Sequence, residues 1–394
     1  MDCGLLGSVF RYDDGVVSEL LGVYGGGLCR FLEAVHRPSR RLYIRVNTLR
    51  VDPGELLDRL RSRGLEVYRD ELFDEALYFV VEGPFRIDEE GPVVVADKEA
   101  AESVMMGANL YAPGLLSCDP SIRRGSEVVI KAPSGVVVAR GIARMSCSEA
   151  RRRGRGLFVE VLQSLYRAPK LRELPEYQQG LFYPQSLPAI ATTRVLDPAP
   201  GEVVVDMCAA PGGKTGHVVE LSRGLAKVVA VDHSRRKVRR LREELARLGH
   251  LRYVEVVEGD SRYIHLDMPG LRADKILVDP PCTALGVRPK VYDEKTWRDL
   301  VNAAAYQEQF VRAAAKILRM GGVLVYSTCT VTHVENELLI EGTALGECLE
   351  PVDTGLPGAW SRGSTGSYRG MYTRFHPHIH DTPGYFIARL VKKC

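Results

Sequence analysis

The residues VVVDMCAAPGGKT at positions 203–215 decide the fold of this chain. The apolar run from Val203 to Asp206 is typical of a buried strand, and the Pro-Gly-Gly corner after it is typical of a tight turn. Residues 214–221 carry apolar side chains at helical spacing, so a helix should follow directly. Glycine lets the backbone approach a ligand at the start of such a helix. The stretch therefore predicts a strand, a turn and a helix that together bind a cofactor.

A second strand indicates what kind of cofactor binds. The apolar run at 227–231 ends at Asp232, twenty residues after Gly212. An acidic side chain at this spacing and at a strand end typically accepts hydrogen bonds from the two hydroxyls of a ribose. The turn lacks the G-x-G-x-x-G pattern, which disfavours a nicotinamide cofactor. We therefore predict a site for a nucleoside cofactor other than a dinucleotide.

The chain from residue 168 to 394 predicts one doubly wound α/β domain. Apolar strand patterns alternate with amphipathic helix patterns after the cofactor turn, as is typical of a mainly parallel sheet. The expected elements are a helix at 235–248, strands at 254–260 and 273–279, a helix at 296–319 and a strand at 322–330.

Six segments carry a family resemblance. They are RVNTLR at 45–50, PEYQQGLFYPQSLPAIATTRVLDPAPGE at 175–202, the cofactor turn at 203–215, DPPCT at 279–283, YSTCT at 326–330 and FHPHIHDTPGYFIARL at 375–390. In this order they resemble the Nop/Sun family of RNA cytosine-5 methyltransferases, with motif I at the turn and motifs IV and VI at the two cysteines. The resemblance implies a Rossmann-like methyltransferase domain that uses S-adenosylmethionine.

The resemblance also implies roles for two thiols. Carbon 5 of cytosine is too electron-poor to take a methyl group directly, and addition of a thiolate at carbon 6 makes it nucleophilic. In the family, the cysteine matching Cys329 attacks and the cysteine matching Cys282 assists product release. DNA methyltransferases attack with the motif IV cysteine, so the second cysteine indicates RNA. Lys214 is expected to favour the thiolate electrostatically, and Asp279 is expected to contact the ring nitrogen or amino group of the cytosine. The target cytosine must be unpaired or flipped out to reach the site.

The cofactor site is expected to draw on the turn and on the ends of the following strands. Its predicted residues are Cys208, Ala209, Ala210, Pro211, Gly212, Gly213, Lys214, Asp232, Lys237, Asp260 and Asp279. Cys208 is expected to shape the turn rather than to react.

Two smaller regions precede the catalytic domain. Residues 1–90 mix helix patterns (15–36, 53–63) with strand patterns (41–47, 76–82) and predict a small α+β layer that packs on the catalytic domain. Residues 91–167 predict a small β-barrel, because short Val-rich strands are separated by Gly, Pro and Ser turns.

The 91–167 region resembles a PUA domain. The resemblance depends on the order of Ala100-Ala101, then GANLYAPG at 107–114, then Arg124-Gly125 before a strand. PUA domains bind RNA, so it implies an RNA partner. Within the GANLYAPG loop, Asn109 and Tyr111 are expected to meet unpaired bases.

Basic residues are concentrated between Arg140 and Arg172. This segment holds nine basic side chains and two carboxylates, a local charge of +7 in a chain of net charge +3, which leaves −4 for the remainder. A charge run is usually a solvated loop. Inside an RNA-binding module, however, we expect Arg151, Arg152, Arg153 and Arg155 to contact phosphates from a glycine-containing loop.

The cysteines and histidines give weaker signals. Nine cysteines are an odd number with no C-x-x-C pair, so neither a disulfide framework nor a zinc site is indicated, and a reducing compartment fits. His376, His378 and His380 would line one face of a strand, but without an acid or thiol partner they do not predict a metal. The remaining six cysteines are expected to be small buried side chains: Cys3, Cys29, Cys118, Cys147, Cys348 and Cys394.

We expect a cytoplasmic protein, because the sequence shows neither a signal pattern nor an apolar run of the ~20 residues that span a bilayer. We also expect a monomer, since no obligate protein partner is evident. The domain order resembles the tRNA branch of the family, which implies formation of 5-methylcytosine in tRNA near the acceptor end. The alternatives are an rRNA methyltransferase of the same family and an RNA-binding assembly factor without catalysis. The presence of Cys282 and Cys329 together with Lys214 and Asp232 argues against the last.

Overall fold

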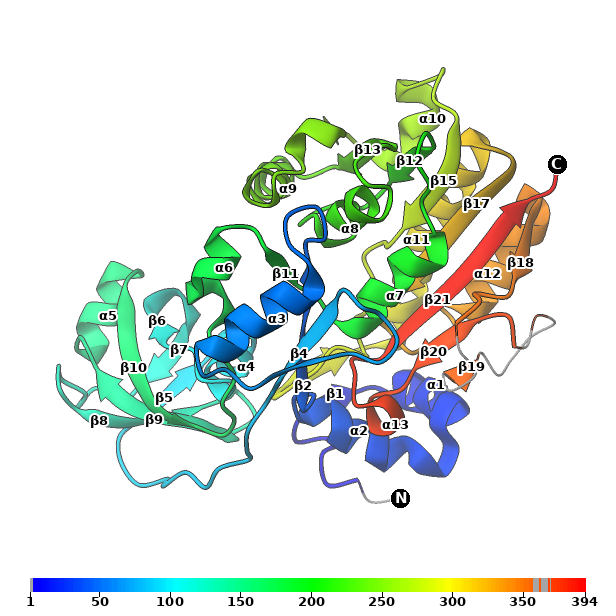
Figure 1. Ribbon diagram of the computed structural model, residues 1–394. Helices are drawn as coiled ribbons and strands as arrows, with labels where there is room; N and C mark the ends of the chain where they lie inside the picture. Colours follow the sequence, from blue (N-terminus) through cyan, green and yellow to red (C-terminus); the bar gives the residue numbers. More distant parts are fainter. Residues whose placement is uncertain (1–2, 357–360, 363–367, 369) are drawn as a thin grey trace.

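A nine-stranded sheet forms the centre of the molecule (Figure 1). The computed structural model describes residues 3–356, 361–362, 368 and 370–394. In space the strands follow the order β14-β13-β12-β15-β17-β21-β20-β19, and β18 pairs with β21 outside this path. Their bounds are β12 Val203–Asp206, β13 Lys227–Asp232, β14 Val254–Glu258, β15 Ala273–Val278, β17 Leu318–Thr328, β18 Leu349–Val352, β19 Ser361–Arg362, β20 Thr373–Phe375 and β21 Tyr385–Lys392.

Helices cover both faces of this sheet. One core cluster joins it to α7 (Leu187–Leu196), α8 (Gly213–Leu221) and α9 (Arg235–Leu248). The opposite cluster joins it to α10 (Ile264–Asp267), α11 (Trp297–Ile317) and α12 (Glu337–Ala344). The predicted doubly wound α/β fold is therefore confirmed.

The strand order reverses beside β12. Strands β13 and β14 lie on one side of β12, and β15 and β17 lie on the other, all in parallel. In open α/β sheets, ligands bind at the carboxyl ends of the strands where the order reverses. Asp206 and Asp232 end β12 and β13, and Cys282 and Cys329 follow β15 and β17. The fold thus brings the predicted site residues to one edge of the sheet.

The first ninety residues form two separate groups. Helices α1 (Asp14–Tyr24) and α2 (Leu28–His36) share a core with Leu285, Leu300 and Val331, and β1 (Phe10–Tyr12) pairs with β16 (Asp293–Lys295). The second group is an antiparallel sheet in the order β11-β2-β4-β3. Its elements are β2 Arg41–Val46, α3 Pro53–Ser62, β3 Val67–Arg69, β4 Ala76–Val80 and β11 Phe182–Pro184, which follows the short helix α6 (Pro175–Gln178).

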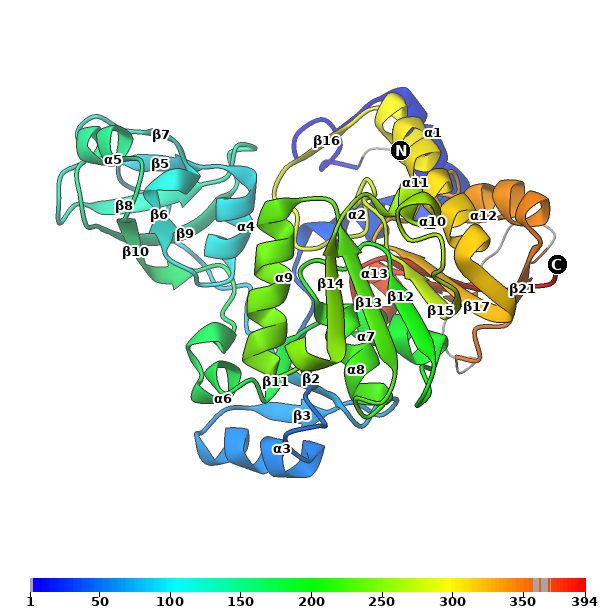
Figure 2. The same ribbon diagram turned by 90° about the horizontal axis from the view of Figure 1, so that it is seen from above.

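A six-stranded mixed sheet stands at one end of the molecule (Figures 1 and 2). It has a core of its own, which includes Val94, Ile130 and Phe158. Its elements are β5 Val93–Ala96, α4 Lys98–Met105, β6 Leu110–Tyr111, β7 Leu115–Cys118, β8 Glu127–Lys131, β9 Val137–Ala143, α5 Cys147–Arg153 and β10 Leu157–Ser164.

The arginines at 151–153 lie in a helix, so the predicted loop is wrong for them. The Ser146 side chain accepts a hydrogen bond from the Glu149 N–H at the start of α5, and Gly154, with φ +58°, ends the helix. Cations are favourable in the last turn of a helix, where the carbonyl ends of the peptide dipoles lie. The charge run that suggested a loop is therefore equally compatible with a capped helix end.

The expectation that the cysteines form no disulfide framework is wrong. Three pairs are bonded: Cys3–Cys29, Cys118–Cys147 and Cys348–Cys394, with Cα–Cα distances of 5.4, 5.9 and 5.3 Å. The partners are 26 to 46 residues apart in sequence. Only tertiary packing brings them within bonding distance, so spacing alone gave no sign of the pairs. The free cysteines are Cys208, Cys282 and Cys329.

The three histidines near the carboxyl terminus do not share a strand face. Strand β20 ends at Phe375, and Pro377 begins the short helix α13 (Pro377–His380). Proline suits a first helical position, where its missing N–H is not needed. Across the described ranges, no group of three or more His, Cys, Asp or Glu side chains is placed to hold a metal ion. Among the helices of those same ranges, none has the length and apolar character to cross a membrane.

A buried ion pair joins the N-terminal sheet to the catalytic domain. Arg45 of β2 is 0% exposed, and its Nε and Nη2 donate to the Glu220 carboxylate of α8 at 2.7 and 2.9 Å. The same guanidinium also donates to Gln185 and to the carbonyl oxygen of Gly213 in the cofactor turn. One side chain thus ties β2 to the helix that follows the turn.

Replacing Arg45 should therefore destabilise the protein strongly. Arg45→Ala leaves the Glu220 carboxylate buried without its partner, which costs about 3–5 kcal/mol of unfolding free energy. Arg59→Ala is the matched control, because its pair with Glu55 is exposed and such pairs contribute at most about 1 kcal/mol. Denaturant unfolding checks both variants. Equal stability losses would contradict the role assigned to Arg45.

Candidate active site

The turn after β12 is held in shape by its neighbours. The Thr215 hydroxyl donates to Asp206 at 2.7 Å, and the Ala209 N–H donates to the Val231 carbonyl oxygen at 3.0 Å. Gly212 has φ +111°, a conformation that other residues rarely adopt, and a Cβ on Gly213 would lie 2.7 Å from the Tyr183 ring. These two positions therefore require glycine, which explains the sequence of the corner.

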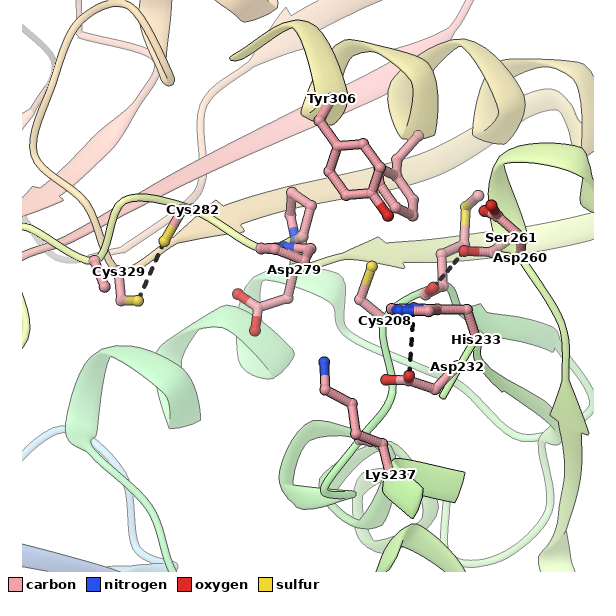
Figure 3. Close-up of a pocket in the computed structure, with 16 residues that line it drawn as sticks. Cys208, Asp232, His233, Lys237, Asp260, Ser261, Asp279, Cys282, Tyr306 and Cys329 are labelled. Atoms are coloured by element: carbon pink, nitrogen blue, oxygen red, sulfur yellow. Dashed lines mark hydrogen bonds and ion pairs between the residues drawn. The ribbon is translucent and has the colours of Figure 1, made fainter. Parts of the chain in front are cut away.

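A cavity of about 240 Å³ opens at this edge of the sheet. Figure 3 shows Cys282 and Cys329 at one end, Asp232, His233 and Asp260 at the other, and Asp279 between them. The lining includes six of the predicted cofactor residues, Cys208, Ala210, Asp232, Lys237, Asp260 and Asp279. The other five shape the turn outside the lining: Ala209, Pro211, Gly212, Gly213 and Lys214.

Sequence reasoning missed several residues of this cavity. Tyr306 and Phe310 of α11 line it, with ring centroids 5.1 Å apart. They lie four positions apart and so share a helix face. That spacing is also typical of a core face, so it did not single them out. His233 and Ser261, next to the predicted Asp232 and Asp260, line it too.

The two thiols at the inner end of the cavity are in contact. The Cys282 and Cys329 Sγ atoms are 3.3 Å apart. The hydrogen bond that Cys282 donates lowers the pKa of Cys329, although burial opposes this. The same hydrogen bond, together with burial, raises the pKa of Cys282 well above its ordinary value. Both directions favour Cys329 as the thiolate and Cys282 as its protonated partner. Burial raises the pKa of Cys208, which agrees with a structural role for that thiol.

Asp279 lies between the two thiols and Asp232 in the cavity (Figure 3), and three hydrogen-bond donors hold its carboxylate in place. Lys214 Nζ donates to its Oδ2 at 2.6 Å, and the hydroxyls of Ser327 and Tyr385 donate to its Oδ1 at 2.7 and 2.9 Å. Burial lowers the pKa of Lys214, but the charge of Asp279, the Tyr385 hydroxyl and the hydrogen bonds to both together outweigh burial, so the pKa is raised well above its ordinary value. The ammonium group therefore stays charged beside the carboxylate.

The comparisons with known proteins agree with this geometry. A family profile described as 16S rRNA methyltransferase RsmB/F matches residues 193–391, and the PUA domain profile matches residues 92–165. The tRNA (cytosine(72)-C(5))-methyltransferase of Pyrococcus horikoshii is 44% identical over 373 residues, which are 92% of each chain. This chain belongs to the Nop/Sun family of RNA cytosine-5 methyltransferases.

Two further relatives extend the comparison. Human tRNA (cytosine(72)-C(5))-methyltransferase NSUN6 is 28% identical and aligns with 78% of this chain and 72% of its own. The crystal structure of NSun6 from Pyrococcus horikoshii with SFG has a TM-score of 0.88 at 42% identity, and covers 97% of this chain and 98% of that one. The predicted methyltransferase fold with a PUA domain is therefore confirmed.

The methyltransferase uses S-adenosylmethionine as its cofactor, and the cavity residues fit that molecule. Asp232 is 6% exposed at the end of β13, and its Oδ1 accepts from the Ser234 N–H at 3.1 Å. A buried carboxylate so placed suits the ribose hydroxyls. Tyr306 and Phe310 add apolar ring surface. Lys237 and Asp260 add one charge of each sign to the lining, and Asp260 is paired with Arg262 at 2.5 Å.

The PUA loop of the methyltransferase faces a larger cavity of about 710 Å³. Asn109 and Tyr111 line it, together with residues 168–173 and the segment Val287–Pro289, which follows the Cys282 loop. The Asn109 side-chain oxygen accepts from the Val161 N–H at 2.9 Å, whereas Tyr111 is 55% exposed. Tyr111 therefore offers the open ring surface, and Asn109 orients the loop.

Acidic partners neutralise much of the basic segment at 140–172. Arg151, Arg152 and Arg155 are exposed, and no carboxylate partner is found for them within the described part of the chain. Five other cations of the segment form ion pairs with carboxylates: Arg140 with Asp88 and Glu127, Arg144 with Glu160, Arg153 with Glu149, Arg167 with Glu82, and Lys170 with Glu173. The local charge of +7 therefore overstates what this surface presents to RNA.

The contact between the thiols predicts an order of reactivity with alkylating reagents. Because its pKa is lowered, Cys329 should be alkylated by iodoacetamide at lower pH than Cys282. Cys282→Ala removes the hydrogen bond that lowers the pKa of Cys329, while the burial that raises this pKa remains. Alkylation of Cys329 should therefore begin at a higher pH in this variant. Peptide mass spectrometry measures both profiles, with Cys208→Ala as the control that leaves them unchanged. Faster alkylation of Cys282 than of Cys329 would contradict this assignment.

Proposed function

We propose that this chain methylates carbon 5 of cytosine 72 in tRNA. The observation that carries the proposal is the similarity to the Pyrococcus horikoshii tRNA (cytosine(72)-C(5))-methyltransferase, which extends over 92% of both chains and includes the PUA domain. The thiol pair at 3.3 Å supports it, because it supplies the nucleophile that this reaction needs. The predicted acceptor-end substrate is consistent with position 72.

The reaction begins with the thiolate of Cys329. It adds to carbon 6 of the flipped-out cytosine, so that a sulfur–carbon bond forms and the electron pair of the 5,6 double bond moves to carbon 5. Bound S-adenosylmethionine supplies an electrophilic methyl group at that carbon. We assign Asp279 to contact the ring nitrogen or amino group of the base, because Lys214, Ser327 and Tyr385 hold its carboxylate in place.

Release of the product needs the second thiol. The carbon-5 proton must leave so that the double bond reforms and the bond between Cys329 Sγ and carbon 6 breaks. Cys282 lies in contact with Cys329 and lines the cavity, so we assign it to this step: after its own proton has passed to solvent, its thiolate accepts the carbon-5 proton as the Cys329 thiolate leaves. Its raised pKa keeps it protonated in the free enzyme, where it stabilises the Cys329 thiolate by a hydrogen bond.

The rRNA alternative has less support. The ribosomal RNA small subunit methyltransferase B of Serratia proteamaculans aligns with 56% of this chain. The rRNA (cytosine-C(5))-methyltransferase NOP2C of Arabidopsis thaliana aligns with 84% at 23% identity, against 92% at 44% identity for the Pyrococcus tRNA enzyme. The PUA domain at 92–165 lies outside the profile with the rRNA name, which starts at residue 193. The non-catalytic alternative does not explain a thiol pair in contact. Cytoplasmic location, a monomeric state and independence from protein partners stay predictions.

The decisive experiment uses total tRNA, labelled S-adenosylmethionine and mapping of the modified nucleotide. We expect 5-methylcytosine at position 72 of tRNA. Label that enters purified ribosomal RNA instead, and not tRNA, would favour the rRNA alternative.

Variants of the two cysteines test the division of labour. Cys329→Ser should abolish both methylation and the covalent RNA adduct. Cys282→Ala should permit attack and stall release, so that protein cross-linked to RNA accumulates on a denaturing gel. Adduct with Cys329→Ser and none with Cys282→Ala would reverse the assigned roles.

The exposed arginines of the PUA domain should contribute affinity for RNA. Replacing Arg151, Arg152 and Arg155 by Ala should raise the Kd for tRNA. The slope of log Kd against log salt concentration should fall by about one for each phosphate that is no longer neutralised. Arg153→Ala is the matched control, since Arg153 is paired with Glu149 at 2.9 Å. Filter binding measures the slopes, and S-adenosylmethionine affinity should not change. An unaltered salt slope in the triple variant would contradict this role.

A further inference from the structure

Two consecutive buried residues, Glu335 and Asn336, hold the chain on both sides of the two thiols. Both are 0% exposed, and neither belongs to the lining of the cavity. They lie just before α12, several residues after Cys329 in sequence. Their side chains point away from substrate and into the two loops that carry the cysteines, so they cannot act on the base directly.

Glu335 holds the Cys282 loop. Its Oε2 accepts from the Thr283 N–H and from Gln307 Nε2, both at 2.9 Å. Gln307 Nε2 also donates to the Pro281 carbonyl oxygen at 3.0 Å. The residue before Cys282 and the residue after it are therefore both fixed through the Glu335 carboxylate and its partner on α11.

Asn336 holds the Cys329 loop in the same way. Its Oδ1 accepts from the Thr328 hydroxyl at 2.7 Å, and its Nδ2 donates to the carbonyl oxygens of Thr332 at 2.7 Å and Thr330 at 3.4 Å. Thr328 and Thr330 flank Cys329. The residues on both sides of the attacking thiol, Thr328 through its hydroxyl and Thr330 through its carbonyl oxygen, are thus anchored to one amide group.

A hydroxyl chain connects the two loops. The Thr283 and Thr330 hydroxyls, each directly after a cysteine, are 2.8 Å apart. Because the Thr283 hydroxyl also donates to Glu335, the Thr330 hydroxyl must donate to Thr283. The separation of the thiols is therefore set from behind by a network that substrate does not touch.

We propose that Glu335 and Asn336 are positioning residues with different targets: Glu335 places the Cys282 thiol for release, and Asn336 places the Cys329 thiol for attack. This inference rests on the roles proposed above for the two cysteines. It assigns opposite consequences to substitutions at neighbouring positions, which a general loss of packing does not produce.

The test follows covalent RNA adduct and turnover in variants of the full-length protein. Glu335→Gln leaves one acceptor oxygen where the carboxylate has two, so either the Thr283 N–H and Gln307 or the Thr283 and Thr332 hydroxyls lose their acceptor and face an amide donor, and the Cys282 loop shifts. Adduct should accumulate as in Cys282→Ala, and kcat should fall by about ten- to a hundredfold, as for a displacement on the order of 1 Å. KM for S-adenosylmethionine should not change. Asn336→Leu should instead slow adduct formation.

Two further variants separate positioning from stability. Glu337→Gln is the matched control, because Glu337 is also 0% exposed but pairs with Arg374 at 2.6 Å. It should lower the Tm without accumulating adduct. Gln307→Leu removes the α11 side chain that donates to the Pro281 carbonyl oxygen, and this variant should also accumulate adduct. It tests the role of the Cys282 loop if circular dichroism shows that Glu335→Gln does not fold.

Cys282→Ala and Cys329→Ser on the same gel distinguish the possible failures. If Cys282→Ala accumulates no adduct, the proposed thiol roles are wrong. The positioning inference is overturned by a different result: Cys282→Ala accumulates adduct, but a folded Glu335→Gln or Gln307→Leu variant releases RNA as fast as the unchanged protein. Equal accumulation in Glu337→Gln would also overturn it, because the effect would then be a general loosening of the loop.

Discussion

The parallel pairing of β15 with β17 is the constraint on which the whole site depends. Val278 lies opposite Tyr326 in this pairing. Asp279 and Ser327 therefore both follow the last residue pair between β15 and β17, joined by a hydrogen bond of 2.7 Å, and the segments beyond them bring the thiols into contact. A slip of one residue would turn alternate side chains to the opposite face. Since both faces of these strands are buried, the packing of the core decides where the chemistry takes place.

Much of this arrangement could be predicted from the sequence, because each part leaves a local signal. The strand at 203–206, the glycine corner and Asp232 have a recognisable order and spacing, and the structure places them as expected around one cavity. Cys282 and Cys329 stand directly after apolar strands, and parallel strands bring their carboxyl ends to the same edge. The family motifs added the division of roles between the two thiols, which spacing alone does not supply.

The parts that escaped prediction depend on contacts between distant segments. The spacing of Tyr306 and Phe310 matches both a core face and a ligand-facing one. The disulfide partners are far apart in sequence, and most acidic partners of the PUA arginines lie on other elements. Glu335 gave no signal in the sequence as an isolated polar residue, because its partners Thr283 and Gln307 lie 52 and 28 positions away.

The distribution of sulfur has a practical consequence. Six cysteines are locked in disulfides, and the three that remain free, Cys208, Cys282 and Cys329, all line a single cavity. The native protein thus carries one chemically addressable locus without any engineering. An electrophilic dye or spin label of modest size would report from the catalytic centre itself, and its signal would follow the arrival of RNA at the place where the bond is made.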